Sequence, residues 1–484
     1  MYKFFFISFL LYFILIFQIP FIIGDEGYYS ISITDTINEG IKPYTLFLGM
    51  PAFWKPPLMI DVYALIAIPL IEIFNMDMVY AYRFGSVIFS TINVVLVYLI
   101  ANSFLDKEKA KWVTIIFALN PVILIYGTKI FMETMSLTFV LLGILGSIKF
   151  IEKNENLWLG LIPISIFGAA YTKSFTIGIM SILLCGLYFV LFNLNKINKY
   201  ILSVLIGVGL CILFAYYSGF PETYYNLFIE DFFTTRMQSM YVGNFFTTLS
   251  TLIYLIPLLF VGWRNIDLKD KKNIFMIIWI LPLIPILIKT PFVWYAFYFI
   301  LPLTYLAIKG LKMDSIDLIV ILFLILIGMF IAHLNFVEHS GDEIVKIHNF
   351  LKEEVGKEKC LFVIGAPEVV TYSYLYHEGF TFNFILNGGF NYTGNYRTSA
   401  HFFTEQEINN LKNNYLSNYD NCIENKEYLY LSVSVYENNF RSCKESCIKP
   451  DYILISAIPE IEIENCEIIK NYNNLVLWKC SYVE

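Results

Sequence analysis

The chain has 484 residues, of which 57% are hydrophobic and 15% charged, with a formal net charge of -7. Soluble globular chains carry about 25% charged residues, so this composition excludes an ordinary soluble protein and indicates a membrane protein. The acidic balance, with no basic stripe outside short loops, argues against a nucleic-acid partner.

The composition changes once along the chain. Long apolar runs alternate with short polar connections up to about Asn335, and Asn, Glu, Lys and Tyr dominate afterwards. We therefore predict a polytopic α-helical membrane domain over residues 1–335, and a soluble extracytoplasmic domain of mixed α/β class over residues 336–484. An outer loop over residues 24–78 carries an acidic motif.

The first apolar run, Phe4–Ile23, is long enough to cross the hydrocarbon core. Lys3 precedes it and no small-residue cleavage site follows, which predicts a retained signal anchor. The other predicted spans are Val79–Leu105, Lys111–Gly127, Ile130–Ile151, Leu157–Tyr171, Ser174–Phe192, Tyr200–Ser218, Asn244–Trp263, Asn273–Ile288, Phe292–Ile308 and Ile316–Leu334.

One further run, Leu58–Phe74, is apolar but short and contains Asp61, Pro69 and Glu72. If it does not span, the lysine and arginine clusters of the later loops face the cytoplasm, and if it spans they face outward against the positive-inside rule. We therefore read it as an interfacial or re-entrant helix. This assignment leaves about eleven spans, an odd number, and predicts a cytoplasmic N-terminus and an extracytoplasmic tail in a cell membrane.

With this number of spans, eight charged residues lie in outer loops or at the outer ends of spans. Any one of them could be a snorkelling residue, but ionisable groups near the bilayer are costly and usually paired or functional. Together they predict a site on the outer face. These residues are Asp25, Glu26, Lys55, Arg83, Glu133, Lys173, Arg236 and Lys289.

The sequence contains no P-loop and no GxGxxG motif, and the outer face has no supply of nucleotide sugars. A sugar transferase there needs a lipid-borne donor. Asp25 and Glu26 could accept the acceptor's proton, while Glu26 or Glu133 could help hold a divalent cation, Mg or Mn rather than Zn. The alternative for Asp25-Glu26 is a solvated helix end.

Basic side chains would stabilise the departing lipid phosphate, on which charge develops in the transition state. Arg offers a bidentate fork to phosphate and Lys a point charge. The candidate phosphate-binding residues are Lys55, Arg83, Lys173, Arg236 and Lys289.

Several short motifs occur in an order that resembles the C-type membrane glycosyltransferases, in the branch of protein O-mannosyltransferases and lipid A aminoarabinose transferases. The motifs are Gly24-Asp25-Glu26-Gly27-Tyr28-Tyr29, Lys55-Pro56-Pro57-Leu58, Arg83 opening a span, Glu133 opening a later span, Lys173 in Tyr171-Thr172-Lys173-Ser174, and an aromatic stretch, Trp294–Pro302, ending in Leu-Pro. The resemblance covers about the first 310 residues.

The resemblance implies an inverting enzyme that uses a polyprenyl- or dolichyl-phosphate sugar, often with a divalent metal. It implies that Asp25 is the catalytic base, that Lys55, Arg83 and Lys173 contact the lipid phosphate, and that Glu133 is a second acidic residue of the cavity. Relatives often carry Asp at the Glu133 position and more often Lys-Gly where this chain has Lys173-Ser174. The Trp-Trp-Asp signature of oligosaccharyltransferases is absent, which disfavours transfer of whole glycans to Asn.

The acceptor would be a hydroxyl on a protein, a glycan or a lipid. Two other readings stay open from the sequence. A transporter or flippase of lipid-linked sugars also needs many spans, but it predicts symmetric halves that the sequence does not show. A scaffold whose tail binds an envelope component would leave the ordered charges unexplained.

The cysteines are distributed unevenly between the two predicted domains. Cys185 and Cys211 lie in apolar runs and are read as small buried hydrophobes. The six others fall in the tail, where their even number favours disulfides over free thiols or a metal site. They are Cys360, Cys422, Cys443, Cys447, Cys466 and Cys480.

The tail also contains a sequon, Asn391-Tyr392-Thr393, which is compatible with an outer location. Its hydrophobic patterns predict two helices and four strands. The helices are Asp342–Val355 and Glu368–Glu378, and the strands are Cys360–Ile364, Tyr428–Val435, Tyr452–Ile458 and Leu475–Trp478.

Overall fold

The computed structural model describes residues 2–18, 26–47, 50–52, 56–218, 255–263, 266–281, 293–313, 315–338, 361–364, 382–387, 428–433, 452–456, 466–472 and 475–480. The chain divides into two compact units. The first contains Met1–Pro20 and Lys55–His339, and the second contains Phe21–Trp54 and Ser340–Glu484. The domain boundary at 335/336 stays a prediction.

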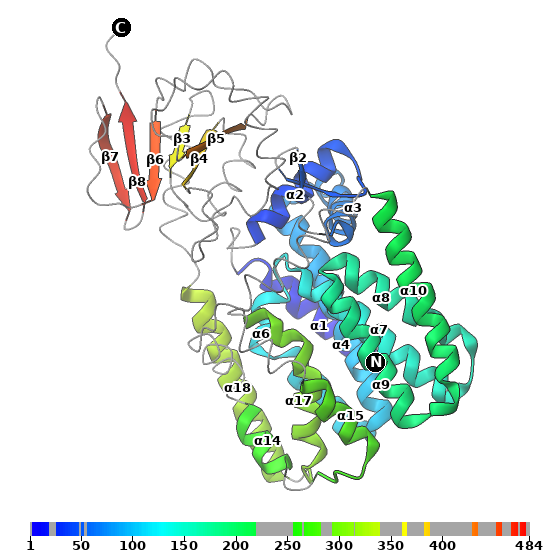
Figure 1. Cartoon of the computed structure of the whole chain (residues 1–484). Helices are drawn as coiled ribbons and strands as arrows, with labels where there is room; N and C mark the ends of the chain where they lie inside the picture. The colour runs from blue at the N-terminus through cyan, green and yellow to red at the C-terminus, as the bar shows by residue number, and fades with distance from the viewer. Residues whose placement is uncertain are drawn as a thin grey trace. The chain divides into compact units, whose positions relative to one another are not determined.

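The first unit is helical throughout its described part (Figure 1). Its helices are α1 (Tyr2–Leu15), α3 (Leu58–Glu72), α4 (Met78–Phe104), α5 (Lys107–Ala118), α6 (Pro121–Tyr126), α7 (Met132–Lys153), η1 (Asn156–Gly160), α8 (Leu161–Thr172), α9 (Phe175–Phe192), η2 (Leu194–Lys196), α10 (Ile197–Tyr217), α14 (Ile256–Trp263), α15 (Lys271–Ile280), η5 (Val293–Ala296), α17 (Phe297–Lys309) and α18 (Ser315–Glu338).

Among the described residues, four helical stretches are long and apolar enough to cross a membrane: Met78–Phe104, Met132–Lys153, Phe175–Phe192 and Leu194–Tyr217. Each coincides with a predicted span. Each of four shorter apolar helices overlaps a predicted span: Lys3–Leu15, Asn156–Thr172, Phe297–Lys309 and Asp317–Phe330. The total of about eleven spans stays a prediction.

The predicted span Lys111–Gly127 is not a single helix, because the chain breaks there into α5 and α6. The Asn120 side chain accepts a hydrogen bond from Val122 N at 2.9 Å, and Pro121 follows it at the first helical position. Asn at the N-cap and Pro at the next residue are the usual start of a new helix. The apolar run continues across the break, so hydropathy alone did not reveal it.

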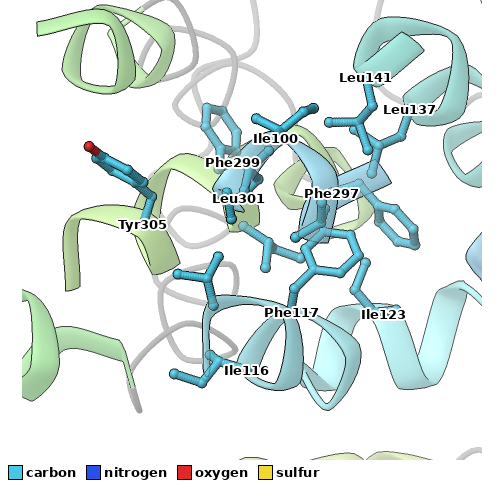
Figure 2. Close-up of a cluster of buried hydrophobic side chains, with 14 of the residues drawn as sticks. Ile100, Ile116, Phe117, Ile123, Leu137, Leu141, Phe297, Phe299, Leu301 and Tyr305 are labelled. Atoms are coloured by element: carbon cyan, nitrogen blue, oxygen red, sulfur yellow. The ribbon is translucent and has the colours of Figure 1, made fainter. Parts of the chain in front are cut away.

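The core of the first unit lies where α4, α5, α6, α7 and α17 meet. Figure 2 shows Phe117 and Ile123 below Phe297, and Leu137 and Leu141 above it. All five side chains are at most 1% exposed. This packing fixes the N-terminal part of α7 between α4 and α17.

Helices α7 and α8 approach closely through a glycine. A Cβ on Gly143 would lie 2.4 Å from Ser165 Oγ, so no larger residue fits there. Small residues at helix contacts allow backbones to come together in membrane proteins. The start of α7 and the end of α8 are thereby brought to the same end of the helix pair.

The second unit combines helix α2 (Glu26–Glu39), the antiparallel pair β1 (Thr45–Phe47) and β2 (Met50–Ala52), and a six-stranded sheet (Figure 1). The sheet has the order β5-β4-β3-β6-β8-β7. Its strands are β3 (Leu361–Ile364), β4 (Phe382–Asn387), β5 (Tyr428–Val433), β6 (Tyr452–Ser456), β7 (Cys466–Tyr472) and β8 (Leu475–Cys480).

Strand β3 pairs in parallel with both β4 and β6, and the outer strands pair antiparallel. The four predicted strands are confirmed as β3, β5, β6 and β8. Sequence patterns missed β4 and β7, whose polar residues interrupt the apolar run. The predicted helices Asp342–Val355 and Glu368–Glu378 lie outside the described residues.

The two cysteines of the apolar runs, Cys185 and Cys211, are buried free thiols, as predicted. Cys185 packs in a cluster with Phe189 and Tyr200. Both therefore act as small core residues of the helical unit.

Candidate functional site

A buried ion pair joins two of the predicted site residues. Lys173 Nζ contacts Glu133 Oε1, and the two side chains are 9% and 1% exposed. A charge removed from water is tolerated only when it is paired or hydrogen-bonded. The pair therefore links the start of α7 to the end of α8 through an interaction that is strong in a low-dielectric interior.

Glu133 lies in the first turn of α7, where the positive end of the helix dipole favours a carboxylate. Its Oε1 is used by Lys173, whereas Oε2 is buried and has no hydrogen-bond partner among the described residues. An unpaired buried acceptor costs about 1–3 kcal/mol. Glu133 Oε2 is therefore an acceptor suited to a ligand hydroxyl.

Lys173 lies at the break between α8 and α9. Helix α8 ends at Thr172 and α9 begins at Phe175. Lys173 Nζ lies 4.3 Å from the centre of the Tyr295 ring, a cation–π contact. Its ammonium group is thus held between a carboxylate and an aromatic face.

Tyr295 was not predicted as a site residue. It belongs to η5, directly before α17, in the aromatic stretch Trp294–Pro302 that the sequence analysis had noted. The stretch is rich in aromatic residues, so local sequence did not single out the one that contacts Lys173.

Arg83 lies in the second turn of α4 and is 1% exposed. Its Nη1 donates to the backbone carbonyl of Ile16, just beyond α1, at 3.0 Å. The guanidinium group is therefore buried, and one of its five donors bonds to the backbone just beyond the end of α1.

Lys129 is a buried basic residue that the sequence analysis missed. It lies in the connection between α6 and α7, four residues before Glu133, and is 4% exposed. Its Nζ lies 5.7 Å from the centre of the Tyr126 ring. The signal in the sequence was a lysine in the short gap between the predicted spans Lys111–Gly127 and Ile130–Ile151.

Glu26, the remaining predicted acidic residue that the structure describes, opens α2 of the second unit and is fully buried. Asp35 of the same helix is 2% exposed and was not predicted. The other predicted residues lie outside the described residues: Asp25, Lys55, Arg236 and Lys289.

The predicted divalent cation was assigned to Glu26 and Glu133. Within the part of the chain that the structure describes, no three His, Cys, Asp or Glu side chains gather to hold a metal. Glu133 Oε1 is taken by the Lys173 ammonium group, and a cation at that position repels another. The described residues therefore do not fit a metal at Glu133, and its chemistry follows from its pairing with Lys173.

Comparison with known families matches residues 55–217 to dolichyl-phosphate-mannose-protein mannosyltransferase. This stretch contains Arg83, Glu133 and Lys173. A comparison with curated protein sequences finds no match.

Solved structures cover nearly the whole chain. ArnT from Cupriavidus metallidurans in the apo state is 12% identical, with a TM-score of 0.71 over 98% of this chain and 97% of that one. ArnT from the same organism bound to undecaprenyl phosphate is 11% identical, with a TM-score of 0.69 over the same shares. The Archaeoglobus fulgidus oligosaccharyltransferase in complex with Zn and sulfate is 12% identical and covers 76% of this chain and 61% of that one, with a TM-score of 0.45.

The ArnT likeness shows the fold, a multi-span helical membrane protein, which confirms the predicted membrane class. The family match and the fold agree with the ordered motifs in the sequence. The predicted enzyme class is likewise confirmed. Residues 55–217 therefore match the dolichyl-phosphate-mannose-protein mannosyltransferase family, and the chain resembles the C-type membrane glycosyltransferases of the ArnT kind in its fold.

Proposed function

We propose that this enzyme moves a sugar from a polyprenyl- or dolichyl-phosphate donor to an acceptor hydroxyl, with inversion at the anomeric carbon, on the outer face of the membrane. The buried ion pair between Lys173 and Glu133 carries this proposal. A lysine held in a protein interior beside a carboxylate and an aromatic ring is a preformed positive group for an anion. It lies in the part of the chain that matches the mannosyltransferase family.

The reaction needs one base. In our proposal the acceptor oxygen attacks the anomeric carbon from the side opposite the phosphate, and Asp25 takes the hydroxyl proton. Glu26, the next residue, supports Asp25 as a positioning partner. The new bond forms from the acceptor oxygen while the bond from the anomeric carbon to the phosphate oxygen breaks, so the lipid phosphate leaves with the electron pair.

The leaving phosphate gains negative charge, and basic residues stabilise it. We assign this role to Lys173 and Arg83 first, because both are largely buried and held by defined contacts. Lys55, Arg236 and Lys289 join them as further phosphate ligands. An acidic residue beside Lys173 orients the ammonium group, and this is the role of Glu133.

The family match and the chemistry of the site support this donor class. ArnT from Cupriavidus metallidurans was solved with undecaprenyl phosphate, which is the kind of lipid phosphate that the donor leaves behind. Burial of basic residues at helix ends suits a phosphate attached to a lipid that stays in the bilayer. The sugar and the acceptor are to be identified by experiment.

Glycan analysis of a strain that lacks the gene identifies the sugar that disappears and whether protein, lipid or a larger glycan carried it. The purified enzyme is then reconstituted with the corresponding polyprenyl-phosphate sugar, beginning with polyprenyl-phosphate mannose. We expect Asp25→Asn to lose transfer while it still binds undecaprenyl phosphate, because an amide cannot accept the proton.

Glu39→Gln is the matched control, because Glu39 is an exposed carboxylate of α2 in the same unit. This variant is expected to keep wild-type turnover. Full turnover by Asp25→Asn would overturn the base assignment. Failure of Lys173→Met to weaken undecaprenyl-phosphate binding would overturn the assignment of the phosphate site.

A further inference from the structure

A stripe of polar side chains runs along one face of α4 in the interior of the helical unit. Arg83, Ser86, Ser90 and Asn93 follow one another at spacings of three, four and three residues, which places them on the same face of a helix. All four are at most 1% exposed. A polar stripe of this kind inside a membrane protein needs hydrogen-bond partners.

The first partners are backbone carbonyls of the connection between α6 and α7. Ser86 Oγ donates to the carbonyl of Lys129, and Ser90 Oγ donates to the carbonyl of Gly127 at 2.6 Å. Tyr63 of α3 lies with its Oη 3.0 Å from Ser86 Oγ. Because the single Ser86 proton is used on Lys129, Tyr63 donates to Ser86.

Asn93 continues the contact into α7. Its Nδ2 donates to the carbonyl of Thr134 at 2.8 Å, and its Oδ1 accepts from Thr138 Oγ1 at 2.7 Å. Because the Thr138 hydroxyl donates to Oδ1, the amide is oriented with Oδ1 towards Thr138 and Nδ2 towards the Thr134 carbonyl. Thr134 directly follows Glu133, so Asn93 holds the backbone next to the site carboxylate.

The connection between α6 and α7 needs hydrogen-bond partners from other parts of the chain. Residues 127–131 are not helical, so the regular hydrogen-bond ladder of a helix does not run through this segment. Unpaired backbone groups are costly inside a bilayer. A Cβ on Gly127 would lie 2.8 Å from Ser90 Oγ, so glycine is required for the segment to lie this close to α4.

A second element holds the same part of α7 from another side. Tyr298 Oη of α17 lies 2.5 Å from Ser136 Oγ, three residues after Glu133. Tyr298 is one turn from Tyr295, the residue that contacts Lys173. The ion pair therefore lies between two hydrogen-bonded supports, one on α4 and one on α17.

We propose that Ser86, Ser90 and Asn93 are positioning residues, which set the place at which the Glu133 carboxylate meets Lys173. The inference rests on the proposed function, in which this pair faces the leaving phosphate. Small displacements of a charged group matter most in the transition state, when the phosphate gains its charge. The polar stripe of α4 thus acts on turnover through Glu133.

Asn93→Leu and Ser90→Ala are measured in the reconstituted assay with the polyprenyl-phosphate sugar. We expect each to lower kcat by about tenfold or more, with the donor KM changed much less, because a displaced catalytic group slows chemistry. Thr91→Val is the matched control, since Thr91 is a fully buried residue of α4 whose hydroxyl bonds to Val87 O of its own helix at 2.7 Å. It is expected to keep wild-type kcat.

A conservative change and a second background separate positioning from a general effect on folding. Thr138→Ser keeps the hydroxyl that fixes Asn93 and is expected to retain activity. Thr138→Val removes this hydroxyl and is expected to lower kcat, as Asn93→Leu does. In a Glu133→Asp background the carboxylate is already displaced. Asn93→Leu is therefore expected to cause a smaller fold-loss there than in the wild type.

Equal fold-losses in the two backgrounds, or wild-type kcat in both Asn93→Leu and Ser90→Ala, would refute the positioning role. Thermal unfolding in detergent is measured alongside, and Ser90→Ala carries the test if Asn93→Leu does not fold. The assay also includes Asp25→Asn, so that the positioning inference and the proposed function can be refuted independently. An inactive Asp25→Asn with fully active stripe variants refutes only this inference, and an active Asp25→Asn refutes the proposed function.

Discussion

Lys173 and Glu133 are forty residues apart in the sequence, yet they form one buried ion pair between the end of α8 and the start of α7. The close α7–α8 contact at Gly143 brings these ends together. The pair also contacts Tyr295, so three separate segments of the chain meet at one ammonium group. Because the site depends on tertiary packing, changes at either partner are expected to affect both stability and activity.

Removal of one partner of this pair is expected to destabilise the protein strongly. Lys173→Met leaves Glu133 buried without its cation, and breaking a buried pair in this way costs about 3–5 kcal/mol. Adding Glu133→Gln to Lys173→Met is expected to recover much of the loss, because the uncompensated charge is removed. Thermal unfolding in detergent checks the order of the wild type, the single variant and the double variant.

The control is Lys149→Met, which breaks the partly exposed pair of Lys149 with Glu152 at 2.7 Å. Partly exposed pairs contribute about 0–1 kcal/mol, so this variant should unfold near the wild-type temperature. A Lys173→Met protein as stable as Lys149→Met would contradict the buried-pair interpretation.

Asp61 predicts a pH dependence of stability. It lies in α3, outside the described helices that are long enough to span, and burial raises the pKa of its carboxyl group to about 7. The folded state therefore binds the proton more tightly than the unfolded state, whose carboxyl has its ordinary pKa near 4. The stability contribution is full below about pH 4 and is lost as the pH rises towards 7.

Asp61→Asn should remove this part of the pH dependence and raise the unfolding temperature at and above pH 7. Unfolding temperatures measured from pH 4 to pH 8 check it. Glu72→Gln, at an exposed position of the same helix, should preserve the wild-type profile. An Asp61→Asn profile parallel to the wild type would show that the carboxyl does not titrate in this window.

The register of the tail sheet predicts one disulfide. Cys466 of β7 and Cys480 of β8 are directly opposite each other in an antiparallel pair. Opposite residues in such a pair have Cα atoms about 4.5–5.5 Å apart, which is within the range that a disulfide spans. In an oxidising compartment we expect these two residues to be joined.

Peptide mass spectrometry of the protein, alkylated without reduction, checks this prediction. A linked peptide containing both cysteines is expected, and it should disappear after reduction. Alkylation of both thiols in protein taken directly from intact membranes would contradict it. Cys185 and Cys211 serve as internal controls, because both are buried free thiols.

The predicted topology places the two ends of α4 on opposite sides of the membrane. Phe74 lies just before the helix and Lys107 just after it, and both side chains are exposed. In intact cells, Phe74→Cys is expected to react with a membrane-impermeant thiol reagent, whereas Lys107→Cys is expected to resist it. Labelling is compared with the unmodified protein, and the reverse pattern would overturn the positive-inside argument.

The sequence by itself determined the membrane class, because long apolar runs have few alternatives to transmembrane helices. It also ordered the charged residues, and the resemblance and enzyme class predicted from that order are confirmed by the family match over residues 55–217. Arg83, Glu133 and Lys173 were correctly predicted to lie at or near helix ends, since each borders an apolar run.

Only the tertiary structure decided which charges meet. The contact of Lys173 with Glu133 and Tyr295 depends on how α7, α8 and η5 pack, and no local pattern encodes that packing. The break at Asn120 was hidden because apolar residues continue on both sides of it. The polar stripe of α4 likewise reads in sequence as scattered serines and an asparagine, because hydrogen bonds to a distant non-helical segment leave no periodic hydrophobic signal.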